Sequence, residues 1–140
     1  MTTTGLHSLL IWTAGGAAVV FGALAAIVVL RGRRIPGEHV FRASRWSRGN
    51  HLFPAQVAVS PTEVVQYVPG WVERREHTIH MAHIASVDVS TNLFFSNVVI
   101  ETSGGSDPVQ CYGHYKHDAV ALKRLINEYQ SAYYKSGPQA

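Results

Sequence analysis

Hydrophobic and polar residues are arranged in three different ways along this 140-residue chain. The first arrangement is the run Leu9 to Leu30, which holds 22 residues and no charged side chain. At the rise of an α-helix the run spans about 33 Å, enough to cross a hydrocarbon core roughly 30 Å thick. We therefore predict one transmembrane helix over residues 9–30, with residues 1–8 on the far side of the membrane.

Small residues recur every four positions inside the predicted helix and form a stripe: Ala14, Ala18, Gly22 and Ala26. In lipid, helices associate through close backbone contact, so the stripe predicts a packing face for a second helix. The alternative is chance, because Ala and Gly are common in membrane helices. A cleaved signal peptide is disfavoured, because no Lys or Arg precedes the run and its apolar part is longer than such peptides carry.

The second arrangement begins at Gln56, where short runs rich in strand formers are separated by turn residues. Pro61, Pro69-Gly70 and the segment Ser103 to Asp107 mark the turns. This pattern predicts an antiparallel meander, with strands at residues 56–60, 64–68, 71–81, 84–89, 97–102 and 109–112 and a further short strand at 39–42.

The third arrangement is a helical period near the C-terminus. Charged and polar residues fill one side, while apolar residues recur at alternating spacings of three and four on the other: Ala119, Leu122, Ile126, Tyr129 and Tyr133. This predicts an amphipathic helix of about four turns. Asp118 stands near its start, and Lys135 and Gly137 stand at its end.

The predicted fold class is mainly β with one C-terminal α-helix, preceded by a single transmembrane helix. We expect the C-terminal helix to close the open end of a rolled sheet. The chain divides into an N-terminus (1–8), the transmembrane helix (9–30), a connector (31–54), the β domain (55–135) and a tail (136–140).

Three segments together resemble the bacterial pleckstrin-homology-like domain family. They are Pro61–Glu76 (PTEVVQYVPGWVERRE), Ile84–Val89 (IASVDV) and Val98–Thr102 (VVIET). The resemblance covers about residues 56–130. It implies a small curved sheet, a partly open barrel, capped by one C-terminal helix and often tethered to a membrane. Phosphoinositide-binding relatives carry basic residues in the loop between the first two strands; here we expect that loop to be Ser60 to Glu63, which lacks Lys and Arg, so inositol phosphate binding is not implied.

The positive charge of the chain is concentrated after the predicted helix. Six arginines lie there against the single acid Glu38: Arg31, Arg33, Arg34, Arg42, Arg45 and Arg48. The rest of the chain carries a net charge of −2, so we expect no nucleic acid partner. Because the basic residues follow the helix, the N-terminus is expected outside and the C-terminal domain in the cytoplasm, at the plasma (inner) membrane. These arginines either contact anionic lipid headgroups or serve only as a topology signal.

No catalytic motif was found. Cys111, the single cysteine, is expected to be a small apolar strand residue. His77, His80 and His83 are spaced three apart, so on one strand they would alternate between faces and not converge on a metal. His114, His117 and Asp118 form only a weak metal candidate. We expect no enzyme activity, no cofactor and no small-molecule substrate.

Leu93, Phe94 and Phe95 form an apolar loop between two predicted strands. The loop is core, a contact for a partner, or a tip that enters the membrane.

Three functions remain open. The first is an accessory or assembly subunit of a larger membrane protein complex, a layout similar to capping subunits of photosynthetic reaction centres and other energy-transducing complexes. The second is a sensor of anionic lipid at the membrane surface, and the third is a histidine-dependent metal protein.

Overall fold

The computed structural model describes residues 3–105 and 107–137. The chain forms two compact units, Met1–Arg33 and Arg34–Ala140. The first unit is the helix α1 (Thr3–Arg31), and its segment Leu10–Arg31 is long and apolar enough to cross a membrane. Within the described chain, none of that segment is buried. The prediction of an N-terminal apolar helix is confirmed, although the helix already begins at Thr3, inside the segment assigned to a separate N-terminus.

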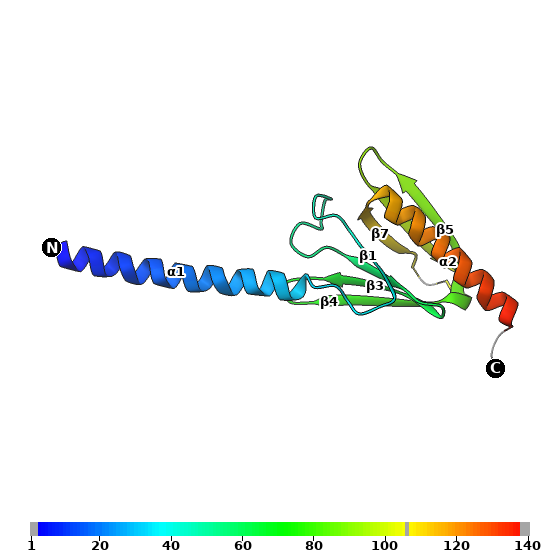
Figure 1. Ribbon diagram of the computed structural model, residues 1–140, viewed down its shortest axis with the longest axis horizontal. Coiled ribbons are helices and arrows are strands. Elements are labelled where there is room, and N and C mark those ends of the chain that lie inside the picture. The colour runs from blue at the N-terminus through cyan, green and yellow to red at the C-terminus, as the bar shows by residue number, and fades with distance from the viewer. Residues whose placement is uncertain (1–2, 106, 138–140) are drawn as a thin grey trace. The chain divides into compact units, whose positions relative to one another are not determined.

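The second unit contains seven strands in two antiparallel sheets. One sheet has the order β1-β2-β3-β4 and the other β5-β6-β7 (Figure 1). The strands of the first sheet are β1 (His39–Arg42), β2 (Gln56–Val59), β3 (Glu63–Pro69) and β4 (Arg74–His80). Those of the second are β5 (Ile84–Thr91), β6 (Ser96–Thr102) and β7 (Val109–His114). Each strand pairs with its neighbour in sequence within its sheet, so the predicted antiparallel meander is confirmed.

The C-terminal helix α2 (Lys116–Ser136) packs against β5, β6 and β2. It buries Ala119, Leu122 and Ile126, the apolar positions that its period predicts. These side chains join a core built from both sheets, including Val57, Met81, Val98, Ile100 and Cys111. The predicted amphipathic helix is therefore confirmed, and Cys111 is a buried strand residue as expected.

Two details of α2 differ from the prediction. The helix has 21 residues, which is nearly six turns and not four, because it extends on both sides of the apolar series that ends at Ala119 and Tyr133. The N-cap is Tyr115, and Asp118 lies inside the first turn. Gly137 ends the helix with a φ of 73°, as its position suggested.

The predicted strand at residues 71–81 is too long at both ends. β4 begins only at Arg74, because Gly70 to Glu73 form a tight turn in which a Cβ on Gly70 would lie 2.6 Å from the carbonyl oxygen of Glu73. At the other end, Met81 begins the 3-10 turn η1 (Met81–His83) and its N–H donates to the carbonyl of Thr62. The chain turns here because β5 belongs to the other sheet.

The loop between the first two strands was also assigned wrongly. Ser60 to Glu63 join β2 to β3, whereas β1 and β2 are joined by residues 43–55, which carry Arg45 and Arg48. The first loop of the sheet therefore carries basic residues, contrary to the prediction. The strand at residues 39–42 was predicted, but it was placed in the connector and not counted as the first strand of the domain.

The β1–β2 loop is held in the second unit by buried polar side chains. The Nδ2 group of Asn50 donates to Ser47 Oγ (2.8 Å) and to the Tyr112 carbonyl, while Asn50 Oδ1 accepts from the Ala55 N–H (2.9 Å). Ser47 Oγ donates to the Ser44 carbonyl (2.8 Å). Because each buried polar group here has a partner, the loop has a defined conformation although it contains no regular element.

Candidate functional site

A cleft of about 550 Å³ runs along β1 in the second unit. Because β1 pairs only with β2, one of its edges is not covered by another strand. The cleft is lined by charged, aromatic and small residues from β1, the segments on either side of it and the start of α2: Arg34, Val40, Phe41, Arg42, Ala43, Ser44, Arg45, Trp46, Tyr115 and Asp118. We call it the arginine cleft, since three of the predicted lipid-contacting arginines meet in it.

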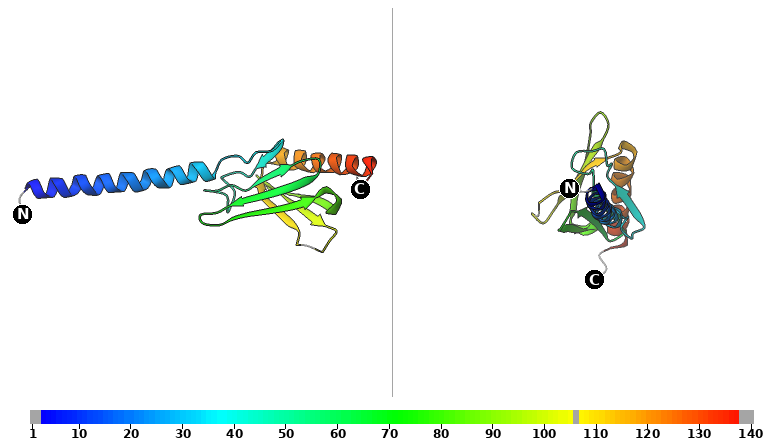
Figure 2. Two further views of the ribbon diagram at one scale, coloured as in Figure 1. Left: turned by 90° about the horizontal axis from the view of Figure 1, so that it is seen from below. Right: turned by 90° about the vertical axis from the view of Figure 1, so that its left-hand side faces the viewer.

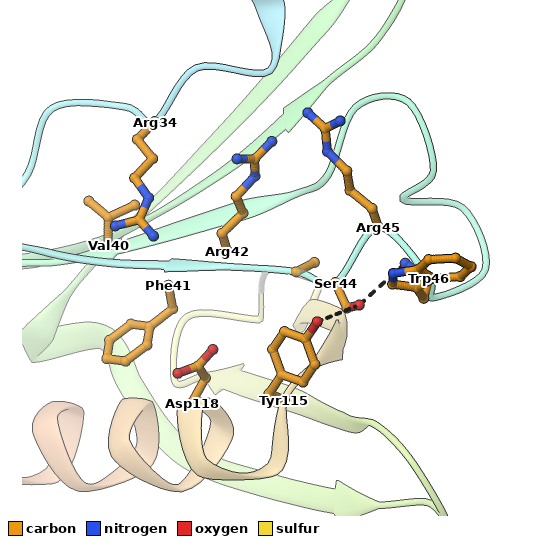
Figure 3. Close-up of a pocket in the computed structure, with 10 residues that line it drawn as sticks. Arg34, Val40, Phe41, Arg42, Ser44, Arg45, Trp46, Tyr115 and Asp118 are labelled. Atoms are coloured by element: carbon orange, nitrogen blue, oxygen red, sulfur yellow. Dashed lines mark hydrogen bonds between the residues drawn. The ribbon is translucent and has the colours of Figure 1, made fainter. Parts of the chain in front are cut away.

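The three arginines lie close to one another. Figure 3 shows the guanidinium group of Arg42 between those of Arg34 and Arg45. Burial, followed by the positive charges of Arg45 and Arg34, lowers the pKa of Arg42 from its ordinary value. The three arginines therefore concentrate positive charge in one place.

Arg42 has donor atoms that nothing in the described chain satisfies. Its Nε and Nη2 atoms are buried, and within residues 3–105 and 107–137 they have no hydrogen-bond partner. A buried donor left unpaired costs about 1–3 kcal/mol, and more when the group is charged. An anion with several oxygen acceptors, such as a phosphate or carboxylate group, matches these donors in charge and in the number of hydrogen bonds.

The acid that lines the cleft does not pair with the arginines. Asp118 Oδ1 lies 3.0 Å from Nε2 of His117, and Figure 3 shows Asp118 and Arg42 on opposite sides of β1. In the described residues no ion pair between Asp118 and an arginine occurs. The side of the cleft that carries the arginines thus keeps its positive charge.

Hydrogen bonds connect the cleft to the start of α2. Ser44 Oγ donates to Tyr115 Oη (3.2 Å) and accepts from the N–H of Trp46 (3.2 Å), while the N–H of Ser44 donates to the Gly113 carbonyl (2.8 Å). These bonds position Trp46, whose side chain is 84% exposed, beside Arg45. Trp46 and Tyr115 were not predicted as site residues; for Trp46 the available signal was its position between Arg45 and Arg48 in the sequence.

The other predicted arginines do not line the cleft. Arg48 is exposed on the β1–β2 loop, and Arg31 and Arg33 belong to the first unit. The predicted helix-packing residues Ala14, Ala18, Gly22 and Ala26 all lie exposed on α1. Nothing described lies within 4 Å of the position that a Cβ would take on Gly22.

The Leu93–Phe95 loop joins β5 to β6. The side chains of Leu93 and Phe94 are 79% and 73% exposed, whereas Phe95 is half-buried and its ring centroid lies 6.2 Å from that of Tyr115. Leu93 and Phe94 are therefore not core residues. Phe95 fixes the base of the loop against the start of α2.

The histidines do not build a metal centre in the described part of the chain. His77, His80 and His83 line one shallow pocket, because η1 turns the chain between the last two, with ring centroids 6.3 Å apart for His80 and His83. Nevertheless, no group of three His, Cys, Asp or Glu side chains among the described residues has a geometry suited to a metal ion.

His114 lies at the end of β7 and is fully buried. Neither ring nitrogen has a hydrogen-bond partner among the described residues, and burial lowers the pKa of His114, an effect that Asp118 opposes. Burial of this kind favours the uncharged form of the imidazole. Burial also raises the pKa of Cys111 to about 12, so its thiol is not a reactive nucleophile.

No family model matches this chain, and a search of curated proteins found no match.

Proposed function

We propose that this chain is a non-catalytic, membrane-anchored interaction module that serves as an accessory or assembly subunit of a larger membrane protein complex. The observation that carries the proposal is α1, whose membrane-spanning segment is covered by nothing in the described chain. Its stripe of small residues would let a neighbouring helix make close backbone contact. An energy-transducing or photosynthetic complex fits the layout of one membrane helix followed by a β domain.

The second unit supplies the other part of the proposal. Two antiparallel sheets of four and three strands, with a C-terminal helix across them, support the resemblance to bacterial pleckstrin-homology-like domains. Such a fold hosts many functions, so the interaction role is argued from surfaces and not from the fold. The two sheets and α2 share one continuous core, which gives these surfaces a fixed support.

We expect Gly22→Leu to separate the subunit from its complex. A leucine side chain on the small-residue stripe would push a partner helix away, while favouring insertion into the membrane. The variant should reach the membrane in normal amounts but fail to co-purify with the proteins that accompany the wild type in mild detergent. Val28→Leu, which lies on another side of α1, is the matched control and should keep its partners. If Gly22→Leu retains them, or the wild type elutes as a lone monomer, the subunit proposal fails.

We also propose that the second unit lies in the cytoplasm of a bacterium, with α1 in the plasma membrane. The support is the charge asymmetry, because every arginine near α1 follows its apolar run. Protease added to intact spheroplasts should therefore leave residues 56–140 undigested, and digestion should occur only after the membrane is opened. Cleavage before lysis contradicts this orientation.

A further inference from the structure

Exposed apolar side chains gather at one end of the Arg34–Ala140 unit. The β1–β2 loop, the β3–β4 turn and the β5–β6 loop all lie at the end where α2 begins (Figures 1 and 2). Side-chain contacts link these segments in pairs. Phe53 of the β1–β2 loop contacts Trp71 of the β3–β4 turn at a centroid distance of 5.1 Å, and Phe95 of the β5–β6 loop contacts Tyr115, which also accepts a hydrogen bond from Ser44. We call this end the loop face.

The apolar residues of the loop face stand on the tips of separate loops. Trp46, Val72, Leu93 and Phe94 are 84%, 93%, 79% and 73% exposed. They project from three different connections, and of these four residues only Trp46 also lines the arginine cleft. Isolated apolar tips of this kind can enter the boundary between headgroups and acyl chains, where Trp is especially favoured. A folded protein partner would instead need a contiguous complementary surface.

The arginine cleft adjoins these tips, since Trp46 belongs to both. Its positive charge and the unpaired Nε and Nη2 atoms of Arg42 call for an anionic oxygen ligand at the same end of the unit. Anionic phospholipids offer such a group at the depth of the headgroups, directly above the depth that the apolar tips would reach.

We propose that the loop face docks on an anionic lipid bilayer: a lipid phosphate group occupies the arginine cleft, and the tips of the three loops lie in the membrane interface. This goes beyond the subunit role, because it needs no partner protein. The sequence adds one argument for a bilayer over other anionic surfaces. Arg34, which lines the cleft, follows the last residue of α1 by only three positions, so the chain that connects them is short.

The test uses the full chain reconstituted in nanodiscs, with a polarity-sensitive fluorophore on the loop face. Asn92→Cys carries the label beside Leu93 without removing an apolar tip, and Ala132→Cys on α2 is the control position. Cys111 is buried and is not expected to compete for the label. Emission and quenching by brominated acyl chains are compared in discs of phosphatidylcholine alone and in discs that contain phosphatidylglycerol.

With phosphatidylglycerol present, quenching at position 92 should be at least roughly twofold stronger than at position 132, and it should weaken in phosphatidylcholine alone or at high salt. Replacing Arg34, Arg42 and Arg45 by glutamine should abolish the difference. The matched control replaces Lys123, Arg124 and Lys135 on α2 by glutamine, removing the same charge, and should leave the signal unchanged. A cooperative urea transition establishes that each variant is folded.

A second variant, Leu93→Ser with Phe94→Ser, keeps the charge and should lower the quenching on its own. Equal signals at positions 92 and 132, or equal signals in the two lipid compositions, would overturn the proposal. A further outcome would also overturn it: the emission of the label at position 92 changes only when a protein that co-purifies with the chain is added to the discs. The loop face would then bind protein and not lipid. The result is separable from the subunit proposal, since these discs contain this chain alone and Gly22 is unchanged.

Discussion

Gly113→Ala is expected to destabilise the second unit by about 3 kcal/mol, because left-handed strain and steric overlap act together. Gly113 has a φ of 78°, a conformation that residues with a Cβ rarely adopt. A Cβ at this position would lie 2.0 Å from Ser47 Oγ and 2.4 Å from Ser47 Cβ. The Ser47 Cβ cannot move away without its backbone, so the β1–β2 loop would have to shift.

Gly49→Ala is the matched control for this prediction. Gly49 lies in the β1–β2 loop, as Ser47 does, and has a φ of 89°. However, nothing described lies within 4 Å of the position that a Cβ on Gly49 would take. It should therefore show only the conformational cost, about 1 kcal/mol. Urea unfolding of the full chain in mild detergent, followed by near-ultraviolet circular dichroism, gives both values. Equal losses for the two variants would mean that Ser47 yields easily and that the loop is not held tightly against β7.

Leu122→Ala should cost the second unit about 3 kcal/mol, because it leaves a cavity between α2 and the sheets. Leu122 is fully buried, at 0% exposed, and belongs to the core that α2 shares with both sheets. The urea midpoint should fall while the slope of the transition stays constant, as expected when stability changes but the surface exposed on unfolding does not.

Val120→Ala is the control for the packing of α2. Val120 is on the same helix but 62% exposed, so its truncation should change stability by less than about 0.5 kcal/mol. A loss of similar size at positions 120 and 122 would contradict the observed orientation of α2. It would also mean that the period of three and four residues does not mark the buried side of this helix.

The elements with strong periodic signals were predictable from sequence. The apolar run of α1 and the spacing of Ala119, Leu122 and Ile126 are local patterns, set by how far apart side chains stand on a helix. The strands around Val57, Val98 and Val109 were also predicted from a local pattern, namely short runs of strand-forming residues between turn residues. Trp71 and Met81 were misassigned because strand formers also occur in turns, where tertiary contacts override their preference.

The candidate site was only half predictable. The sequence shows the arginines, but it does not show which of them line the cleft and which lie elsewhere. That division depends on the pairing of β1 with β2. Arg42 meets Arg34 and Arg45 in the cleft, whereas Arg48 remains apart on the loop. Ser44 and Tyr115 are 71 positions apart in the sequence and are joined by a hydrogen bond that no local pattern could indicate.

By itself, the sequence determined that this protein has one apolar helix able to span a membrane, an antiparallel β domain and an amphipathic C-terminal helix. These features follow from the period of hydrophobic residues, which each segment expresses alone. Only the tertiary structure decided that the apparent connector is part of the domain, held by Ser47, Asn50 and Gly113, and that three arginines meet in one cleft beside the exposed Trp46. Those features depend on contacts between distant residues, where burial and hydrogen-bond satisfaction select one arrangement from many that the local pattern allows.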